Sequence, residues 1–336
     1  MSTIKHVAAR AGVSFTTVSH VLNGTRRVSD SARQRVELAV AEMGYSPSAV
    51  ARSLKTSTTS ILGVMVPNIT NPFFAELTRG IEDCCHRADY AVFLCNSDDD
   101  PQRQARYLQT LLERRVDGLL LAAAAGEAEA LAKRLRPTGV PTVVVDRSIA
   151  GLPADLVRVD HQHGARLAVE HLVALGHRAI ACLSGPSEFA VSRARVEGWR
   201  QAMAQAQITI EDGWLLEGEF SAAVGHHLTR RLLGSRNDVT AILAGNDLMA
   251  IGALRAAAEL NVPVPQALSV IGFDGIELGG YVYPALTTVG YPIRELGERA
   301  ATVLIERIAS GSTQDREVVL NAQVIVREST AAARTR

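Results

Sequence analysis

This 336-residue sequence has few aromatic residues, few cysteines and no net charge. Aromatic residues make up only 4% of the chain, so an aromatic side chain in a loop is a candidate for ligand contact. The four cysteines show no CxxC motif and no metal-ligand spacing with histidine, a pattern typical of free thiols in a reducing cytoplasm. Because 35 basic residues balance 35 acidic ones, overall charge identifies no partner.

The sequence also lacks the motifs of several other protein classes. No apolar run reaches the ~18 residues of a transmembrane helix, and the polar start MSTIKHVAAR does not resemble a signal peptide. We therefore expect a cytoplasmic protein without a membrane partner. GxGxxG, Walker and GxSxG motifs are missing, which argues against an enzyme on an α/β body. We expect no catalytic residue, no cofactor and no metal, since the pairs His161/His163 and His226/His227 lack further ligands at suitable spacing.

Positive charge is gathered at the beginning of the chain. Residues 1–60 contain eight basic and three acidic side chains, a net of +5, so the remainder carries a net of −5. A neutral chain with such an asymmetry favours nucleic-acid binding by its basic end.

Residues 3–45 have the pattern of three short helices. Thr3 can cap the first helix, Gly12 ends it, Ser14 can cap a second one, and a third runs from Ser29 or Asp30 to Gly44. Two helices joined by a tight glycine turn form a helix-turn-helix motif. The second helix has an apolar inner face, and outside or flanking that face are small polar and aromatic side chains suited to base edges in a major groove: Phe15, Thr16, Thr17, Ser19 and His20.

A serine–proline pair, Ser46-Pro47, can start a further helix of about nine residues. Helices below ~12–15 residues are marginal alone in water, so we predict a hinge that folds when it docks. Leu54 near its end could wedge into a minor groove beside Lys55. Taken singly, Leu54 could equally be a core residue, and the second helix could equally be an ordinary amphipathic helix. The order of helix, turn, helix, third helix and Ser-Pro hinge along the chain is what favours DNA binding.

From residue 60 onward, apolar runs alternate with helical patterns, which predicts parallel α/β sheets. The pattern restarts near residue 179 and implies two similar lobes. The predicted strands are 61–67, 91–95, 118–122, 142–146, 156–160, 179–185, 241–247, 269–275, 317–321 and 324–326.

Ligands of open α/β sheets bind beyond the carboxyl ends of the strands. The side chains expected there are typical of a sugar site, because aromatic faces pack on sugar rings and charged planar groups bind vicinal hydroxyls. They are Phe73, Phe74, Asp146, Arg147, Arg195, Phe220, Asn246 and Asp274. Individually, the two phenylalanines could equally be core residues, and the arginines beside the aspartates could equally form structural ion pairs. We expect Asp98–Asp100 to form a solvated loop and helix start, and Asp247 to cap a helix.

Two strings, VSFTTVSHVLNGTR (13–26) and YSPSAVARSLK (45–55), resemble the DNA-binding end of the lactose-repressor (LacI/GalR) family, most closely its ribose- and purine-repressor members. The resemblance implies base reading by Phe15, Thr16 and His20, a major-groove contact by Arg26, and hinge contacts by Ala51, Leu54 and Lys55. His6 departs from the family pattern, which has an acidic residue there, and this weakens the expected cap of the first helix.

The body resembles the same family's sensor domain and periplasmic ribose-binding proteins, through TNPFFAEL (70–77), VDR (145–147), SRARVEGW (192–199), GNDLMAIGA (245–253) and IGFDGIELG (271–279). This resemblance implies that Phe73 and Phe74 sandwich a sugar ring, that the aspartates, the arginines and Asn246 bind the hydroxyls of the sugar, and that Phe220 closes the far wall of the site. Pro67 and Gly290 stand where ribose binders tend to have polar side chains, so the identity of the sugar stays open.

The expected architecture is an all-α helix-turn-helix domain (1–45), a hinge helix and linker (46–59), and a two-lobed α/β periplasmic-binding-protein-like domain (60–330). By resemblance, lobe 1 spans about 60–160 and 291–321, and lobe 2 about 161–290 and 322–330. We expect a homodimeric transcription repressor that binds a palindromic double-stranded DNA operator under control of a small sugar, ribose or a relative. The alternatives are a purine-type corepressor-dependent repressor, a sugar-binding transport protein or an enzyme.

Overall fold

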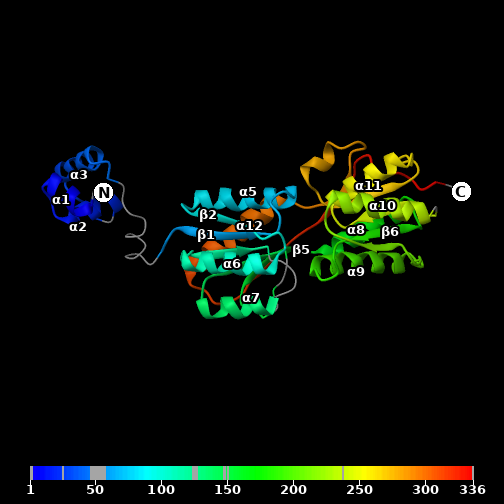
Figure 1. Ribbon diagram of the computed structural model, residues 1–336, viewed down its shortest axis with the longest axis horizontal. Coiled ribbons are helices and arrows are strands. Elements are labelled where there is room, and N and C mark those ends of the chain that lie inside the picture. The colour runs from blue at the N-terminus through cyan, green and yellow to red at the C-terminus, as the bar shows by residue number, and fades with distance from the viewer. Residues whose placement is uncertain are drawn as a thin grey trace. The chain divides into compact units, whose positions relative to one another are not determined.

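The computed structural model in Figure 1 describes residues 3–24, 26–45, 58–122, 128–146, 149, 151–236 and 238–334. The chain divides into two compact units, Met1–Thr59 and Ser60–Arg336. The predicted hinge helix and Arg147 lie outside the described residues.

Within residues 3–24 and 26–45, the first unit contains three helices, as the sequence predicts: α1 (Ile4–Ala11), α2 (Phe15–Asn23) and α3 (Asp30–Glu42). One apolar side chain from each helix is fully buried where the three meet, namely Val7, Val18 and Val36. Gly12 has a φ of 66°, and this left-handed residue ends α1 and turns the chain into α2. The tight turn therefore depends on a residue without a Cβ atom.

Side chains cap both helices of the motif. The Thr3 hydroxyl accepts from the His6 N–H and the His6 Nδ1 accepts from the Thr3 N–H, each over 3.4 Å. This is a reciprocal capping box with an imidazole in the acidic residue's place, so the expectation that His6 weakens the cap is wrong. Ser14 Oγ accepts from the Thr17 N–H over 3.1 Å and caps α2, as predicted.

The second unit contains two six-stranded sheets, and every pair of strands described in them is parallel except β10 with β12. The first sheet has, in spatial order, β11 (Glu317–Leu320), β5 (Asp155–Val159), β4 (Thr142–Val145), β3 (Gly118–Leu121), β1 (Ile61–Val66) and β2 (Ala91–Asn96). The second has β12 (Gln323–Ile325), β10 (Thr287–Gly290), β9 (Ser269–Asp274), β8 (Ala241–Ala244), β6 (Ile180–Ser184) and β7 (Leu215–Glu217).

Helices cover both faces of each sheet, which is why the strands read as continuous apolar runs. Helices α5 (Pro72–Arg87) and α12 (Ile293–Ser310) lie on one face of the first sheet, and α6 (Pro101–Glu113) and α7 (Ala128–Leu135) on the other. The second sheet lies between α8 (His161–Ala174) with α9 (Ala190–Gln205) and α10 (Ala222–Ser235) with α11 (Asp247–Glu259). Two short 3-10 turns, η1 (Arg136–Thr138) and η2 (Glu277–Gly280), are the remaining elements of the described ranges.

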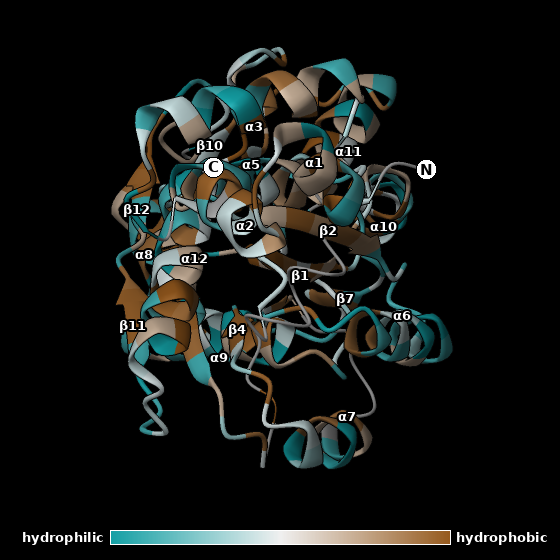
Figure 2. Cartoon of the chain, turned by 90° about the vertical axis from the view of Figure 1, so that its left-hand side faces the viewer, coloured by the Kyte–Doolittle hydropathy of each residue, from teal (hydrophilic) through white to brown (hydrophobic). Residues whose placement is uncertain are grey.

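The hydropathy view agrees with this layering (Figure 2). Strands such as β4 and β11 are largely brown, whereas α6 and α7 carry teal residues. None of the helices within the described ranges combines the length and the apolar character that a membrane span requires.

The chain passes between the two sheets three times. It leaves the first sheet after β5, returns after β10 to form α12 and β11, and leaves again to form β12. Each sheet is consequently built from distant parts of the sequence, and the segments after Val159, Gly290 and Leu320 join the two lobes.

Two helices of the first lobe meet backbone to backbone at glycines. A Cβ atom on Gly80 of α5 would lie 2.1 Å from the Arg294 carbonyl oxygen, and one on Gly297 of α12 would lie 2.2 Å from that of Leu77. We therefore expect Gly80→Ala to lower the free energy of unfolding by about 1–3 kcal/mol, the usual cost of overpacking. Gly234→Ala, in α10, is the matched control because its Cβ would meet no atom within 4 Å. Urea denaturation that showed equal stability for the two variants would contradict this packing.

Candidate functional site

The outward side of α2 carries the candidate base-reading residues. Phe15 is 61% exposed, Thr16 is exposed, and Val18 on the opposite side is fully buried. The Thr17 hydroxyl lies 2.9 Å from the Ser14 hydroxyl, so it supports the cap and is only half-exposed. A short helix with its hydroxyl and aromatic side chains at the solvent-facing N-terminal end has the geometry of a recognition helix.

The remaining predicted DNA contacts are less uniformly placed. Ser19 and His20 are half-buried on α2, and Arg26 is exposed just beyond it. Ala51, Leu54 and Lys55 lie outside the described residues.

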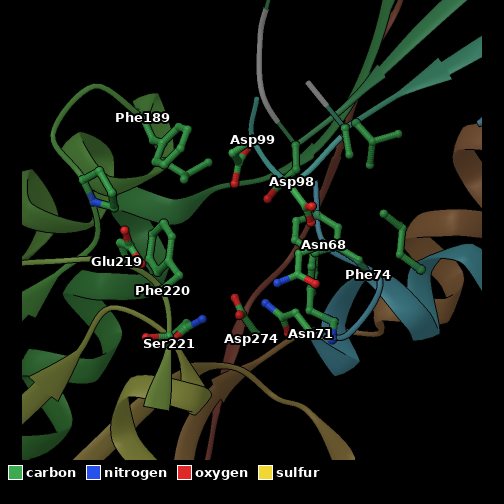
Figure 3. Close-up of a pocket in the computed structure, with 18 of the residues that line it drawn as sticks. Asn68, Asn71, Phe74, Asp98, Asp99, Phe189, Glu219, Phe220, Ser221 and Asp274 are labelled. Carbon is green, nitrogen blue, oxygen red and sulfur yellow. Dashed lines mark hydrogen bonds between the residues drawn. The ribbon is translucent and has the colours of Figure 1, made fainter. Parts of the chain in front are cut away.

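A cavity of about 640 Å³ lies between the carboxyl ends of the two sheets (Figure 3). The structure brings seven of the eight predicted ligand contacts to its wall, and the eighth, Arg147, is outside the described residues. The seven are Phe73, Phe74, Asp146, Arg195, Phe220, Asn246 and Asp274. Figure 3 shows Phe189, Glu219 and Phe220 on one wall and Asn68, Phe74, Asp98 and Asp99 on the other.

Two aspartates stand at strand ends in the left-handed region. Asp146 follows β4 with a φ of 64°, and Asp274 ends β9 with a φ of 110°. Residues held in such sparsely populated conformations cluster at functional sites. Here the turn after each strand directs a carboxylate into the cavity.

A hydrogen-bonded series joins these aspartates. Asp146 Oδ1 lies 2.6 Å from His161 Nε2, His161 Nδ1 lies 3.2 Å from an Arg195 Nη, and that nitrogen donates to Asp274 Oδ1 over 3.0 Å. Tyr291 also donates to Asp274 Oδ1, over 3.2 Å. All five side chains are buried or nearly so, and Arg195 also donates to the Gly245 carbonyl.

The two carboxylates differ in acidity. Burial raises the pKa of Asp274, against the opposing charge of Arg195. Burial also disfavours the charged form of Asp146, but contact with His161 and the nearby Arg195 outweigh it and lower the pKa of that carboxyl. Burial and the charge of Asp274 raise the pKa of Tyr291 well above 10, so the phenol stays a hydrogen-bond donor.

The aromatic rings form two groups. Phe73 and Phe74 pack against each other edge to face, 4.8 Å apart and at 79°, which leaves no space for a ring between them, so the expected sandwich of a sugar ring by these two residues is wrong. Phe189 and Phe220 are nearly parallel, 6.3 Å apart and at 27°. The stacked pair therefore offers the flatter apolar wall.

Sequence reasoning missed several wall residues, namely Asn68, Asp98, Asp99, Glu188, Phe189, Glu219 and Ser221. The expectation that Asp98–Asp100 form a solvated loop and helix start is confirmed, since all three residues are exposed, and Asp98 and Asp99 also line the cavity. Asp100 does start α6, accepting from the Gln102 N–H over 2.8 Å. The rule that ligands bind beyond strand ends, applied to β2, would have found both wall aspartates.

Asp247 does not cap α11, contrary to expectation. Asn246 does so by accepting from the Met249 N–H over 2.9 Å. The fully buried Asp247 accepts instead from the Ile276 N–H over 2.8 Å and the Thr288 hydroxyl over 2.5 Å. Burial and the charge of Asp274 raise the pKa of Asp247 to about 7.

Two family models match this chain. The model for "Periplasmic binding proteins and sugar binding domain of LacI family" covers residues 59–328, and that for "Bacterial regulatory proteins, lacI family" covers residues 3–48. The chain is 41% identical to the ribose operon repressor of Escherichia coli (strain K12), over 98% of this chain and 100% of that protein. It is 39% identical to the HTH-type transcriptional repressor PurR of Photobacterium profundum, over 98% of both.

Solved structures agree. A LacI family transcriptional regulator from Enterococcus faecium with bound ribose has a TM-score of 0.73 and 36% identity, over 82% of this chain and 100% of that chain. The Lac repressor dimer bound to operator and the anti-inducer ONPF has a TM-score of 0.88 and 31% identity, over 98% and 99%. A recognition helix joined to a two-lobed ligand-binding body defines the class as a ligand-responsive DNA-binding regulator. The chain belongs to the LacI family and is a ligand-responsive DNA-binding repressor.

Proposed function

We propose that ribose or a closely related sugar, bound in the interlobe cavity, controls the affinity of this repressor for its operator. The observation that carries the proposal is the pair of buried carboxylates. All hydrogen bonds that the described residues make to Asp146 and Asp274 go to Oδ1, which leaves each Oδ2 for ligand hydroxyls. Asn246 and the aromatic walls complete a sugar-like set, and the ribose operon repressor and the ribose-bound relative support it.

We propose the domain boundaries 1–45, 46–59 and 60–330, and a homodimer on a palindromic operator. Large apolar side chains support the dimer: Phe93 and Leu94 on the edge strand β2 are 42% and 43% exposed, and Tyr281 and Tyr283 are 79% and 94% exposed. An exposed apolar edge strand needs a covering partner, and a second copy supplies one by twofold symmetry. That symmetry matches two equivalent half-sites in the DNA.

A purine-dependent corepressor is the second candidate. It is favoured by the 39% identity to PurR and by the stacked pair Phe189 and Phe220, against which a flat base can lie. The two candidates have opposite effects on operator affinity, because ribose as an inducer would release the operator and a purine corepressor would strengthen operator binding. In either case we propose that the ligand is bound and released unchanged, so the protein is not an enzyme.

Ribose should bind more tightly than ribose 5-phosphate, by about tenfold or more. The described wall carries six carboxylates and a single guanidinium, that of Arg195, so a phosphate would meet like charges at short range. The carboxylates belong to Asp98, Asp99, Asp146, Glu188, Glu219 and Asp274.

Calorimetric titration of the full chain measures both affinities, with adenine and hypoxanthine as competitors. Fluorescence anisotropy of a labelled operator, selected from random DNA with the same protein, then shows the sign of the response. Selective ribose binding with operator release supports the proposal. Operator binding tightened by a purine base would replace ribose by the second candidate, and tighter binding of the phosphate ester would contradict the charge argument.

A further inference from the structure

His161 lies between two cavity-lining side chains that belong to different lobes. It is the first residue of α8 in the second lobe and is 5% exposed. One ring nitrogen contacts Asp146, which follows β4 of the first lobe, and the other contacts Arg195 on α9 of the second lobe. The imidazole itself is not part of the cavity wall.

The partners of the two ring nitrogens determine where the proton resides. Arg195 carries only donors, and its Nε and one Nη lie 3.3 Å and 3.2 Å from His161 Nδ1. Nδ1 must therefore present a lone pair. The proton then sits on Nε2, which donates to Asp146 Oδ1 over 2.6 Å. A doubly protonated ring would direct an N–H at the guanidinium.

The other groups around His161 are compatible with this neutral form. The ring of Phe273 on β9 lies 5.7 Å away, and the Arg195 guanidinium carbon lies 3.9 Å above the same ring. Asp274, at the end of β9, accepts hydrogen bonds from Arg195 and from the Tyr291 hydroxyl, so a guanidinium already pairs with that carboxylate. His161 thus accepts from Arg195 through the lone pair of Nδ1.

We propose that His161 is a positioning residue for effector binding: in its neutral Nε2–H tautomer it connects Asp146 of one lobe to Arg195 of the other. A ligand that contacts both side chains therefore binds most tightly to the lobe arrangement in which His161 connects them. The inference deepens the proposed function, since it concerns the residue that orients the same site. The ligand gains differential affinity for one lobe arrangement only while this connection holds.

Three variants of the full chain test the role. His161→Gln offers an amide N–H to Asp146 and a carbonyl oxygen to Arg195, whereas His161→Phe fills the same space without either bond. His163→Phe is the matched control, because His163 lies on the same helix and its Nδ1 faces Arg166 outside the cavity wall. We expect His161→Phe to weaken ribose binding roughly tenfold or more, with His161→Gln restoring most of the loss and His163→Phe leaving it unchanged.

Nitrogen-15 NMR of histidine-labelled protein at pH 7.5, without ligand, reads the tautomer directly. The signal that disappears in His161→Gln should have a protonated Nε2 and an unprotonated Nδ1. A protonated Nδ1, or ribose affinity lost equally in the Gln and Phe variants, would overturn the inference. If wild-type protein does not bind ribose at all, the proposed function fails while the NMR result still decides the tautomer.

Discussion

Asp274→Asn should abolish most of the response to effector while operator binding without effector stays intact. The amide oxygen of asparagine can still accept from Arg195 and Tyr291, now at 3.0 Å and 3.2 Å from Oδ1, so the hydrogen bonds beneath the site persist. The amide nitrogen then replaces Oδ2, and a ligand hydroxyl that donates to a carboxylate meets a donor instead. Losing a charge-assisted hydrogen bond costs about 1.5–3 kcal/mol, or roughly 10–150-fold in affinity.

The control for this variant is Asp315→Asn. Asp315 also pairs with an arginine, Arg307, over 3.1 Å, but it lies outside the cavity wall. Calorimetry with ribose and operator anisotropy with and without ribose should separate the two variants. A normal ribose response in Asp274→Asn, or a loss that Asp315→Asn shares, would remove Asp274 from the effector site.

Thr16→Ala should change the base preference of the repressor at one position of each half-site. Thr16 is exposed near the N-terminus of α2, and unlike Thr17 its hydroxyl is not used in the cap of the helix. The folded domain should therefore tolerate the change. A direct base contact contributes about 1–3 kcal/mol of discrimination, so affinity for the wild-type operator should fall roughly 5–150-fold per half-site.

Selection of operators from random DNA, for wild type and variant, measures the preference. Affinity for non-specific DNA should stay unchanged, because phosphate contacts by basic side chains supply it. Thr313→Ala, an exposed position of the second unit, is the control. An unchanged consensus, or an equal loss on all sequences, would show that Thr16 does not read bases.

Most of the strands that sequence reasoning located are buried on both faces, but it also located the more exposed strands β2, β11 and β12. ILGVMV and TVVV form β1 and β4 as expected, because helices on both sides of the sheet require apolar residues at every position. Strands β7 and β10 were not predicted. The first has only three residues, and the second, TTVG, is rich in threonine although all four residues are buried. The Thr287 hydroxyl accepts from the Arg327 N–H and the Thr288 hydroxyl donates to Asp247, so both are accommodated by residues distant in sequence, which no local pattern shows.

The residues of the candidate site also divide into those that a local sequence pattern predicts and those that only long-range contacts position. Asp146, Asn246 and Asp274 were predictable because each lies at the carboxyl end of a strand, and parallel strands bring those ends together. His161 was not, because its partners lie 15 and 34 residues away on elements of both lobes. Phe189 was missed because its loop follows β6 by several residues, and its stacking on Phe220 arises only when that loop folds back.

The threefold passage of the chain between the sheets has a consequence for biosynthesis. A ribosome delivers the first unit as one continuous segment, and that unit can fold as soon as residue 45 has emerged. Neither lobe has this option, because β11 and β12 complete their sheets only near the end of translation, and Ser329 is fully buried beside β9. A nascent chain therefore acquires its DNA-reading helices before it can close the pocket that controls them.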